Sequence, residues 1–327
     1  MGYALVNTVA ISSSVQEQVR QVEDLIRRQA GEEQHPDLRA ALEHLLSAGG
    51  KRIRPTLGLL VGNMLGAPED KLILLGAAVE LLHTATLVHD DLIDGALLRR
   101  GMPTLNARWS PAATVLTGDF LFARAARLAA EIDHLPLMKL FAETLATIVG
   151  GELTQLFSAR GMIDRENYYR RINAKTASLF EMSALAAAMI ATDDHEIRSA
   201  MKTFGYETGM AFQIVDDILD FTGDALAVGK PLGSDLLSGL VTLPAIFYAE
   251  SHPQDPDVLA LPNGAWSNAE HMARLVENVR ASGSIQHALD EAVQHIDRAL
   301  WSLEFVEPGT EREELRNLAR YVVDRRL

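Results

Sequence analysis

Two copies of the pattern Asp-Asp-x-x-Asp occur in distant parts of the chain, within the segments LVHDDLID and FQIVDDILD. Both copies follow apolar, helix-like sequence, and residues four apart share one face of a helix. Like charges at this spacing repel by about 0.2–0.5 kcal/mol per pair. Mg²⁺ relieves such repulsion because it binds carboxylate oxygens together with substrate phosphates. We therefore expect two acidic walls that face each other across a metal-bridged, phosphorylated substrate. The aspartates are Asp90, Asp91 and Asp94 in the first motif and Asp216, Asp217 and Asp220 in the second.

A single acidic triplet is more often a solvated helix face or a helix N-cap. Apolar residues precede both copies, and Ile218 and Leu219 lie inside the second, which argues against simple solvation. The presence of both copies favours a metal site.

Basic residues that could bind phosphate occur close to glycines. Arginine suits bidentate phosphate contacts, and lysine acts as a compact point charge. Taken singly, each would be an ordinary surface charge, but flanking glycines let a backbone approach a ligand closely. The residues are Lys51, Arg52 and Arg54 in AGGKRIRP, Arg99 and Arg100 in LLRRGMP, Lys175 in NAKTASL and Lys230 in VGKPLGSDL.

His83 lies seven residues before Asp90, two helical turns back on roughly the same face. A satisfied core histidine is the alternative. Glu80-x-x-His83 also matches half of the Glu-x-x-His signature of di-iron bundles. The same spacing also occurs at Glu32–His35 and Glu131–His134, but the paired aspartate motifs account better for a metal site and argue against di-iron chemistry.

Helical periodicity extends along most of the chain, and no alternating strand pattern of useful length occurs. Glycine- and proline-rich stretches at 95–106, 223–239 and 252–264 predict loops. We expect an all-α, single-domain bundle of about ten or more helices over 1–327, with 1–13 as a flexible extension. The helices are expected at 15–29, 38–46, 72–93, 112–131, 135–158, 167–191, 196–221, 269–282, 285–305 and 311–325.

The composition limits the class of protein. The 327 residues include no cysteine, which excludes disulfides and Cys-based zinc sites and fits a cytoplasmic protein. A formal charge of −14 argues against general nucleic-acid binding. No signal peptide is recognised, and apolar stretches such as 185–191 are too short to span a bilayer. These features predict a soluble protein with no integral membrane segment.

Several motifs in a fixed order resemble the trans-isoprenyl (polyprenyl) diphosphate synthases, in particular the medium- and long-chain members of the octaprenyl and solanesyl type. The resemblance covers nearly the whole chain, from residue 49 to residue 326. It implies an isoprenoid synthase fold with a central apolar cavity. The motifs are GGKRIRP, HDDLID with LRRG, GDFLFARA, KTASLF, GMAFQIVDDILD and GKPLGSDL.

The resemblance implies that isopentenyl diphosphate is added head to tail to an allylic diphosphate, through an allylic cation formed when diphosphate leaves. Catalysis would be electrostatic, with three Mg²⁺ ions per active site. Asp90 and Asp94, with Asp91 in support, would bind Mg²⁺ on one side of the allylic diphosphate. Asp216, supported by the other two aspartates of its motif, would hold a further ion on the opposite side.

The resemblance also assigns roles to residues outside the aspartate motifs. One group would bind the allylic diphosphate, a second would bind isopentenyl diphosphate, and a third would direct dipoles at the developing cation. In that order, the groups are Arg99, Lys175 and Lys230; Lys51, Arg54, His83 and Arg100; and Thr176 and Gln213.

One position departs from the family pattern. Family members usually carry a lysine in a stretch like Gly-Lys-x-Thr-Leu-Pro, where this chain has Leu240. An expected cation near the allylic diphosphate is therefore absent. Either Lys230 and the metal ions suffice, or activity is modest.

Product length should depend on side chains just before the first motif. In similar short-chain synthases, aromatic residues guard the fourth and fifth positions before it, which here are Thr86 and Ala85. One helical turn rises about 5.4 Å, close to one isoprene unit. These small residues therefore predict a product beyond C20, roughly C30–C50. A C15 or C20 synthase is the alternative.

Two further rivals remain. A class I terpene cyclase usually pairs one aspartate motif with an Asn/Ser/Glu site, which the second motif here argues against. A non-catalytic subunit of a heteromeric synthase tends to lose aspartates, and this chain keeps all six. The resemblance further implies a homodimer, and a long prenyl product implies transient membrane contact during release.

Overall fold

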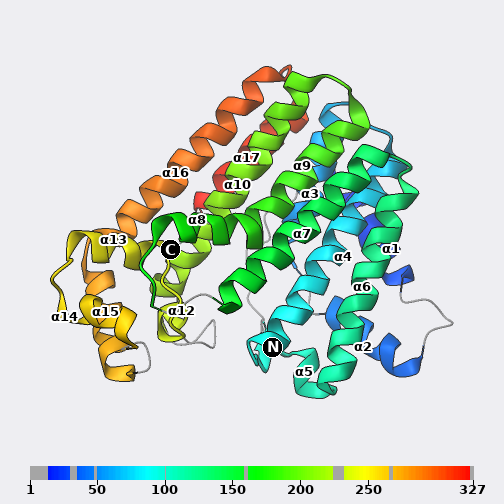
Figure 1. Cartoon of the computed structure of the whole chain (residues 1–327). Helices are drawn as coiled ribbons and strands as arrows, with labels where there is room; N and C mark the ends of the chain where they lie inside the picture. The colour runs from blue at the N-terminus through cyan, green and yellow to red at the C-terminus, as the bar shows by residue number, and fades with distance from the viewer. Residues whose placement is uncertain are drawn as a thin grey trace, which may run out of the picture. The chain divides into compact units, whose positions relative to one another are not determined.

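The computed structural model describes residues 14–29, 35–47, 50–99, 101–157, 161–223, 232–264 and 268–324 (Figure 1). Almost all of their regular structure is helical. The described strands are a two-residue hairpin, β1 (Leu98–Arg99) with β2 (Met102–Pro103). The all-α prediction is confirmed. Arg100, Lys230 and residues 1–13 lie outside the described residues.

The helices occur in the following order, with η1 a π-helical turn and η2 and η4 short 3₁₀ turns. They are α1 (Gln16–Arg28), α2 (Pro36–Ser47), α3 (Ile53–Met64), α4 (Glu69–Ile93), α5 (Leu105–Arg108), α6 (Pro111–Glu131), α7 (Leu135–Phe157), α8 (Arg165–Ile172), η1 (Asn173–Ala177), α9 (Ser178–Ala191), α10 (His195–Thr222), α12 (Ser234–Leu237), α13 (Leu243–Ser251), α14 (Pro256–Ala260), η2 (Leu261–Asn263), α15 (Ala269–Ala281), α16 (Ser284–Ser302), η4 (Leu303–Phe305) and α17 (Thr310–Asp324).

Several elements differ from the helices expected from the sequence. Helix α13 was not expected, and α5, α12 and α14 lie wholly or partly in stretches predicted as loops. Helix α3 was not predicted, because its residues are buried almost all round and its glycines interrupt any apolar stripe. The helix predicted at 167–191 contains the π-helical turn η1, which shifts the register of every later residue relative to an unbroken α-helix.

The chain forms two compact units, each built from separate stretches of sequence. Unit 1 comprises Met1–Glu143, Met182–Lys202 and Phe305–Arg316, and unit 2 comprises Thr144–Glu181, Thr203–Glu304 and Asn317–Leu327. A single domain stays a prediction.

Helix α4 forms the centre of unit 1. It packs against α1, α3 and α6, which surround it in Figure 1. Most of its residues are buried, as expected for a core helix that is apolar on nearly every face. Gly76 lets Val22 of α1 approach the α4 backbone, since a Cβ there would lie 2.9 Å from Val22 Cγ2. The first aspartate motif is thus carried on a tightly held helix.

Helix α8 is a polar helix held by its neighbours in unit 2. Arg165 pairs with Glu250 of α13 and lies over the ring of Phe247, 4.6 Å from its centroid. The Tyr169 hydroxyl donates to Glu291 of α16. These contacts hold α8 against α13 and α16.

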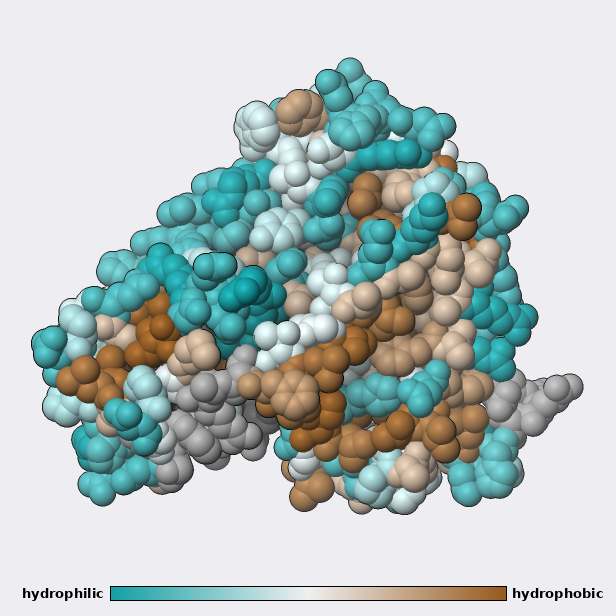
Figure 2. All heavy atoms as spheres, in the orientation of Figure 1, coloured by the Kyte–Doolittle hydropathy of each residue, from teal (hydrophilic) through white to brown (hydrophobic). Residues whose placement is uncertain are grey.

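Two described segments, Glu69–Ile93 and Arg165–Ala191, are long and apolar enough to cross a membrane. Their apolar windows are 67% buried inside the protein, which is usual for core helices, so they are weak evidence for a membrane span. Within unit 2, Figure 2 shows apolar surface over the C-terminal half of α7, where Val149, Leu153, Leu156 and Phe157 are exposed.

Candidate functional site

The first aspartate motif ends helix α4. Asp90 is half-buried, Asp91 is 6% exposed, and Asp94 is the exposed C-cap residue. Arg99 on β1 reaches back to Asp91, with Nε 2.9 Å from Oδ1 and 3.0 Å from Oδ2, and Nη2 2.8 Å from Oδ1. Asp91 is therefore buried together with its own cation, which offsets the desolvation of the carboxylate.

His89 holds this end of α4 against α6. Its ring lies directly on Gly118, where an added Cβ would overlap it unless the ring moved, and Nε2 is 3.1 Å from the carbonyl oxygen of Val115. Nε2 is also 3.6 Å from Asp119 Oδ1. Gly118 begins the GDFLFARA motif, so that motif has a packing role beside the aspartates. The sequence offered no separate signal for His89.

Two of the residues predicted to bind isopentenyl diphosphate meet in unit 1. Arg54 Nη1 lies 3.1 Å from His83 Nε2. Lys51 is exposed at the start of the same segment. These positions are compatible with a common anion site.

Arg52, which lies between Lys51 and Arg54 in the sequence, has a structural role. Its backbone is left-handed, with φ 47°, a strained conformation for a residue with a Cβ. Its guanidinium donates to Glu23 at 2.9 Å and to Glu80. Burial alone would lower the pKa of Arg52, but the charges and hydrogen bonds of Glu80 and Glu23 raise it. Glu80 therefore serves as an ion-pair partner here.

The second aspartate motif lies near the end of α10 in unit 2. Asp217 is 4% exposed and accepts hydrogen bonds from the Tyr168 hydroxyl at 2.7 Å and from Gln213 Nε2 at 2.8 Å. Burial raises the pKa of Asp217 to about 7, with a further increase from Asp235. The two hydrogen bonds oppose that increase. No arginine or lysine pairs with Asp217 among the ion pairs of the described chain.

Asp220 anchors the turn that follows the second motif. Its carboxylate accepts from Ser234 N at 3.1 Å, Ser234 Oγ at 2.6 Å and Asp235 N at 3.1 Å. The Asp220 carbonyl also accepts from Gly233 N at 2.8 Å. Because these donors occupy both carboxylate oxygens, Asp220 is bound as a structural acceptor.

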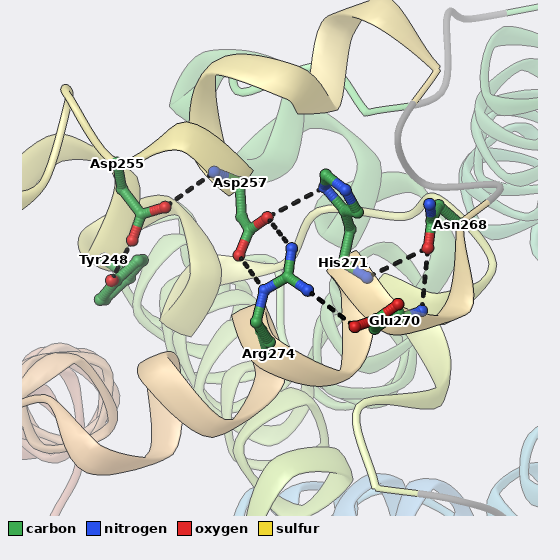
Figure 3. Close-up of polar contacts among 7 residues, drawn as sticks. All are labelled: Tyr248, Asp255, Asp257, Asn268, Glu270, His271 and Arg274. Carbon is green, nitrogen blue, oxygen red and sulfur yellow. Dashed lines mark hydrogen bonds and ion pairs between the residues drawn. The ribbon is translucent and has the colours of Figure 1, made fainter.

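Helix α15 supports this turn from the other side. Gly233 has a positive φ of 68° and lies directly against Val276 of α15. Figure 3 shows how α15 is tied to α14: buried Asp257 accepts two hydrogen bonds from Arg274, at 2.9 and 3.1 Å, and lies 2.9 Å from His271 Nδ1. The ion-pair network therefore supports Asp220 indirectly, because it holds α15, whose Val276 packs against Gly233, and Gly233 N donates to the Asp220 carbonyl.

The π-helical turn η1 presents Lys175 and Thr176. Ala174 rests on Gly151 of α7, where a side chain would overlap it. On α10, a Cβ at Gly209 would lie 2.6 Å from the Ala177 Cα and 2.9 Å from the Phe180 Cβ. Two glycines therefore allow α7 and α10 to pack closely against the turn. Single π-helical turns of this kind are frequent at functional sites.

The side chains on this turn have defined partners. Lys175 Nζ donates to Glu152 at 3.1 Å, and Thr176 Oγ1 donates to Gln213 Oε1 at 2.6 Å. The structure thus joins three residues predicted separately, Thr176, Gln213 and Asp217. Tyr168, which completes this line, was not predicted.

The donor set fits hard divalent cations. The aspartate motifs offer only carboxylate oxygens, which Mg²⁺ prefers. In the part of the chain that the structure describes, no three histidine, aspartate or glutamate side chains gather to hold an ion by themselves. A Mg²⁺ ion bound at either motif would therefore complete its shell with substrate oxygens and water.

Comparison with known proteins identifies the class. The family model described as polyprenyl synthetase matches residues 35–279. The all-trans-nonaprenyl-diphosphate synthase (geranyl-diphosphate specific) of Rhodobacter capsulatus is 39% identical over 86% of this chain and 87% of its own. Component 2 of the heptaprenyl diphosphate synthase of Geobacillus stearothermophilus is 36% identical over 96% of this chain and 97% of its own.

A solved structure gives the same result. The polyprenyl synthase of Caulobacter crescentus CB15, complexed with calcium and isoprenyl diphosphate, is 34% identical, with a TM-score of 0.89 over 97% of both chains. The chain belongs to the polyprenyl synthetase family. The predicted resemblance to medium- and long-chain trans-polyprenyl diphosphate synthases is confirmed.

Proposed function

We propose that this protein is a Mg²⁺-dependent trans-polyprenyl diphosphate synthase that elongates an allylic diphosphate with isopentenyl diphosphate to a product longer than C20. The family match and the named relatives support the reaction class. The observation that carries the proposal is that both aspartate motifs are complete, and that each has a buried middle carboxylate held by specific donors.

The reaction breaks the allylic C–O bond, and diphosphate leaves with the electron pair. The double bond of isopentenyl diphosphate then attacks the allylic cation, and a proton leaves to form the new double bond. Bound Mg²⁺ would stabilise the departing diphosphate. We assign the metal to Asp90, Asp94 and Asp216, and three ions per active site remain the expectation.

The basic and polar residues keep the roles that the resemblance implies. Arg99, Lys175 and Lys230 are assigned to the allylic diphosphate. Thr176 and Gln213 are assigned to the developing cation, because a hydroxyl and an amide oxygen can direct lone pairs at positive charge. Isopentenyl diphosphate is assigned to Lys51, Arg54, His83 and Arg100, of which Arg54 and His83 lie within hydrogen-bonding distance.

Product length is assigned to Ala85 and Thr86 on α4. Ala85 is fully buried and Thr86 is half-buried, with its hydroxyl bonded to the carbonyl of His83 at 2.8 Å. Neither carries a ring, so neither would stop a growing chain early. The relatives include nonaprenyl and heptaprenyl diphosphate synthases, and the similar solved structures include a geranylgeranyl pyrophosphate synthase, so a C15 or C20 product is the outcome to test against.

A subunit of a heteromeric synthase is the second candidate. One relative is named as component 2 of a heptaprenyl diphosphate synthase, which favours this possibility. Leu240 also stands where the family usually has lysine; its backbone N–H donates to the carbonyl of Asp235 at 2.9 Å. All six aspartates are retained, so we place catalysis on this chain whether or not it needs a partner.

We also propose a cytoplasmic homodimer that contacts a membrane transiently when it releases product. The exposed apolar residues of α7 supply a surface that a second copy could cover. A long prenyl chain is nearly insoluble in water, so release needs an apolar acceptor.

The test incubates the purified chain with Mg²⁺, isopentenyl diphosphate and each of dimethylallyl, geranyl, farnesyl and geranylgeranyl diphosphate. Mass spectrometry of the extracted products should show a ladder that ends beyond C20. A ladder that ends at C15 or C20 would keep the reaction and overturn the predicted length. No elongation from any primer would favour the subunit, and Leu240→Lys would then be the first variant to make.

A further inference from the structure

Four side chains in unit 2 form one continuous line of hydrogen bonds, from Tyr168 on α8 to Thr176 on the π-helical turn. Tyr168 Oη donates to Asp217 Oδ2 at 2.7 Å, and Gln213 Nε2 donates to Asp217 Oδ1 at 2.8 Å. Thr176 Oγ1 then donates to Gln213 Oε1 at 2.6 Å. Tyr168, Asp217 and Thr176 are each less than 5% exposed.

The direction of these bonds follows from the chemistry of the groups. Both carboxylate oxygens of Asp217 accept, Oδ2 from the Tyr168 hydroxyl and Oδ1 from Gln213 Nε2, so the NH₂ end of the Gln213 amide is turned toward Asp217. The amide oxygen must then point at Thr176. A threonine hydroxyl has a single hydrogen, and this oxygen takes it. Thr176 therefore keeps its lone pairs, and no O–H, for any further group that approaches.

Besides Gln213, Tyr168 donates a hydrogen bond that holds the Asp217 carboxylate in place. Its ring is 1% exposed, and its hydroxyl reaches Asp217 across 49 residues of sequence. The neighbouring Tyr169 makes a similar bond, to Glu291 on α16, that leads to none of these residues. The two tyrosines thus form a natural pair, one linked to Thr176 and one not.

We propose that Tyr168 is a positioning residue that acts through Asp217 and Gln213 to make the Thr176 hydroxyl a pure acceptor. This rests on the proposed function, in which Thr176 faces the developing allylic cation. An O–H directed at that cation would oppose it, and a lone pair would stabilise it. In this proposal Asp217 orients Gln213 and, through it, Thr176, whereas the adjacent Asp216 is assigned to the metal ion.

The first experiment compares Tyr168→Phe with Tyr169→Phe in steady-state elongation. Tyr168→Phe should lower kcat about tenfold and leave KM for isopentenyl diphosphate unchanged, because the loss is confined to the transition state. Tyr169→Phe should keep kcat within about twofold, because its hydrogen bond to Glu291 does not lead to Thr176. Equal effects of the two variants, or no effect of Tyr168→Phe, would overturn the proposal.

Asp217→Asn tests the direction of the bonds with almost no change of shape. An asparagine there offers both an oxygen and an NH₂, so the Gln213 amide is no longer held with its oxygen toward Thr176, and Thr176 can present its hydrogen. We expect a loss of kcat larger than that of Tyr168→Phe. We also expect Thr176→Val to remove the effect of Tyr168→Phe, since the double variant should be no slower than Thr176→Val alone. Additive losses would contradict a route through Thr176.

A readout without turnover separates this proposal from the proposed function. In protein labelled with ¹⁵N-glutamine, the side-chain NH₂ of Gln213, assigned with Gln213→Leu, should exchange slowly with solvent. Exchange should speed up in Tyr168→Phe and not in Tyr169→Phe. Fast exchange in the unmodified protein would overturn the hydrogen-bond line even if elongation is found. Slow exchange without elongation would refute only the proposed function.

Discussion

The middle aspartates of the two motifs are equally buried and differently held. Asp91 is 6% exposed and accepts from the guanidinium of Arg99, whereas Asp217 is 4% exposed and accepts from the neutral donors Tyr168 and Gln213. Asp91 is thus paired directly with an arginine, whereas Asp217 makes no ion pair among the described residues. Burial raises the pKa of Asp217 to about 7, and the charge of Arg171 opposes this increase only in part. One sequence motif therefore occurs in two electrostatic settings.

The difference suggests a division of labour. In the first motif the middle carboxylate fixes a cation on the β1–β2 hairpin, and in the second it fixes the polarity of an amide and a hydroxyl. The outer aspartates Asp90, Asp94 and Asp216 are assigned to metal in both. The following predictions test this division, from the largest effect on turnover to the smallest.

Removing an outer aspartate should have the largest effect. Asp90→Ala and Asp216→Ala should each lower kcat by at least about 10³-fold, because charge stabilisation of the leaving diphosphate is lost. Melting temperatures should stay close to that of the unmodified protein. Asp70→Ala, in the first turn of α4, is the control and should keep full turnover. Retained turnover in either outer variant would refute the metal assignment.

Substitution of Gly209, which packs against the π-helical turn, should reduce turnover and stability more than substitution of Gly118, which packs against His89. At Gly209 a Cβ would press on the backbone of η1, 2.6 Å from the Ala177 Cα, so Gly209→Ala should lower kcat about 10–100-fold and destabilise the protein by about 1–3 kcal/mol. At Gly118 it would meet the ring of His89, which can swing away, so Gly118→Ala should cost less.

Gly150 is the control for both, because nothing lies within 4 Å of its added Cβ. Gly150→Ala should be neutral or slightly stabilising. Thermal melts and kcat measured together on the three variants give the ranking. A larger loss of kcat and stability in Gly118→Ala than in Gly209→Ala would show that the contact of Gly209 with the π-helical turn is not the critical one.

The stability of the metal-free protein should depend on pH because the pKa of Asp217 is raised. Its pKa is raised from the ordinary 3.8 to about 7, so the folded state binds this proton more tightly than the unfolded state. Its contribution to stability is therefore full below about pH 4 and is lost as the pH rises through about 7, by at most about 4 kcal/mol.

Melting curves from pH 5 to pH 8 in a chelating buffer measure this contribution. The unmodified protein should lose stability relative to Asp217→Asn across this range, because the variant has no group to titrate at this position. A pH-independent difference would show that Asp217 ionises normally.

Substitutions on α4 should change product length with little effect on the rate of the first addition. Ala85→Tyr and Thr86→Phe should each shorten the final product in the mass spectrum. Thr86→Phe is the milder variant, since Thr86 is half-buried whereas Ala85 is fully buried and a ring there overpacks the core. An unchanged product distribution in both would contradict the assignment of chain length to this helix.

Much of the fold could be predicted because apolar periodicity marks most of the helices. Helix α3 could not, since it is buried on nearly all faces and shows no stripe. The residues of the candidate site could be found from motif spacing and resemblance. Their partners could not: Tyr168 and His89 act through contacts with residues 49 and 29 positions away, and nothing in local sequence encodes such pairings.

Binding of Mn²⁺ in the presence of inorganic diphosphate, measured by electron paramagnetic resonance on the six single Asp→Asn variants, tests the division of labour most directly. Asp90→Asn, Asp94→Asn and Asp216→Asn should each lose bound Mn²⁺. Asp91→Asn, Asp217→Asn and Asp220→Asn should keep the number of ions bound by the unmodified protein. Loss of Mn²⁺ from Asp217→Asn equal to that from Asp216→Asn would contradict the account.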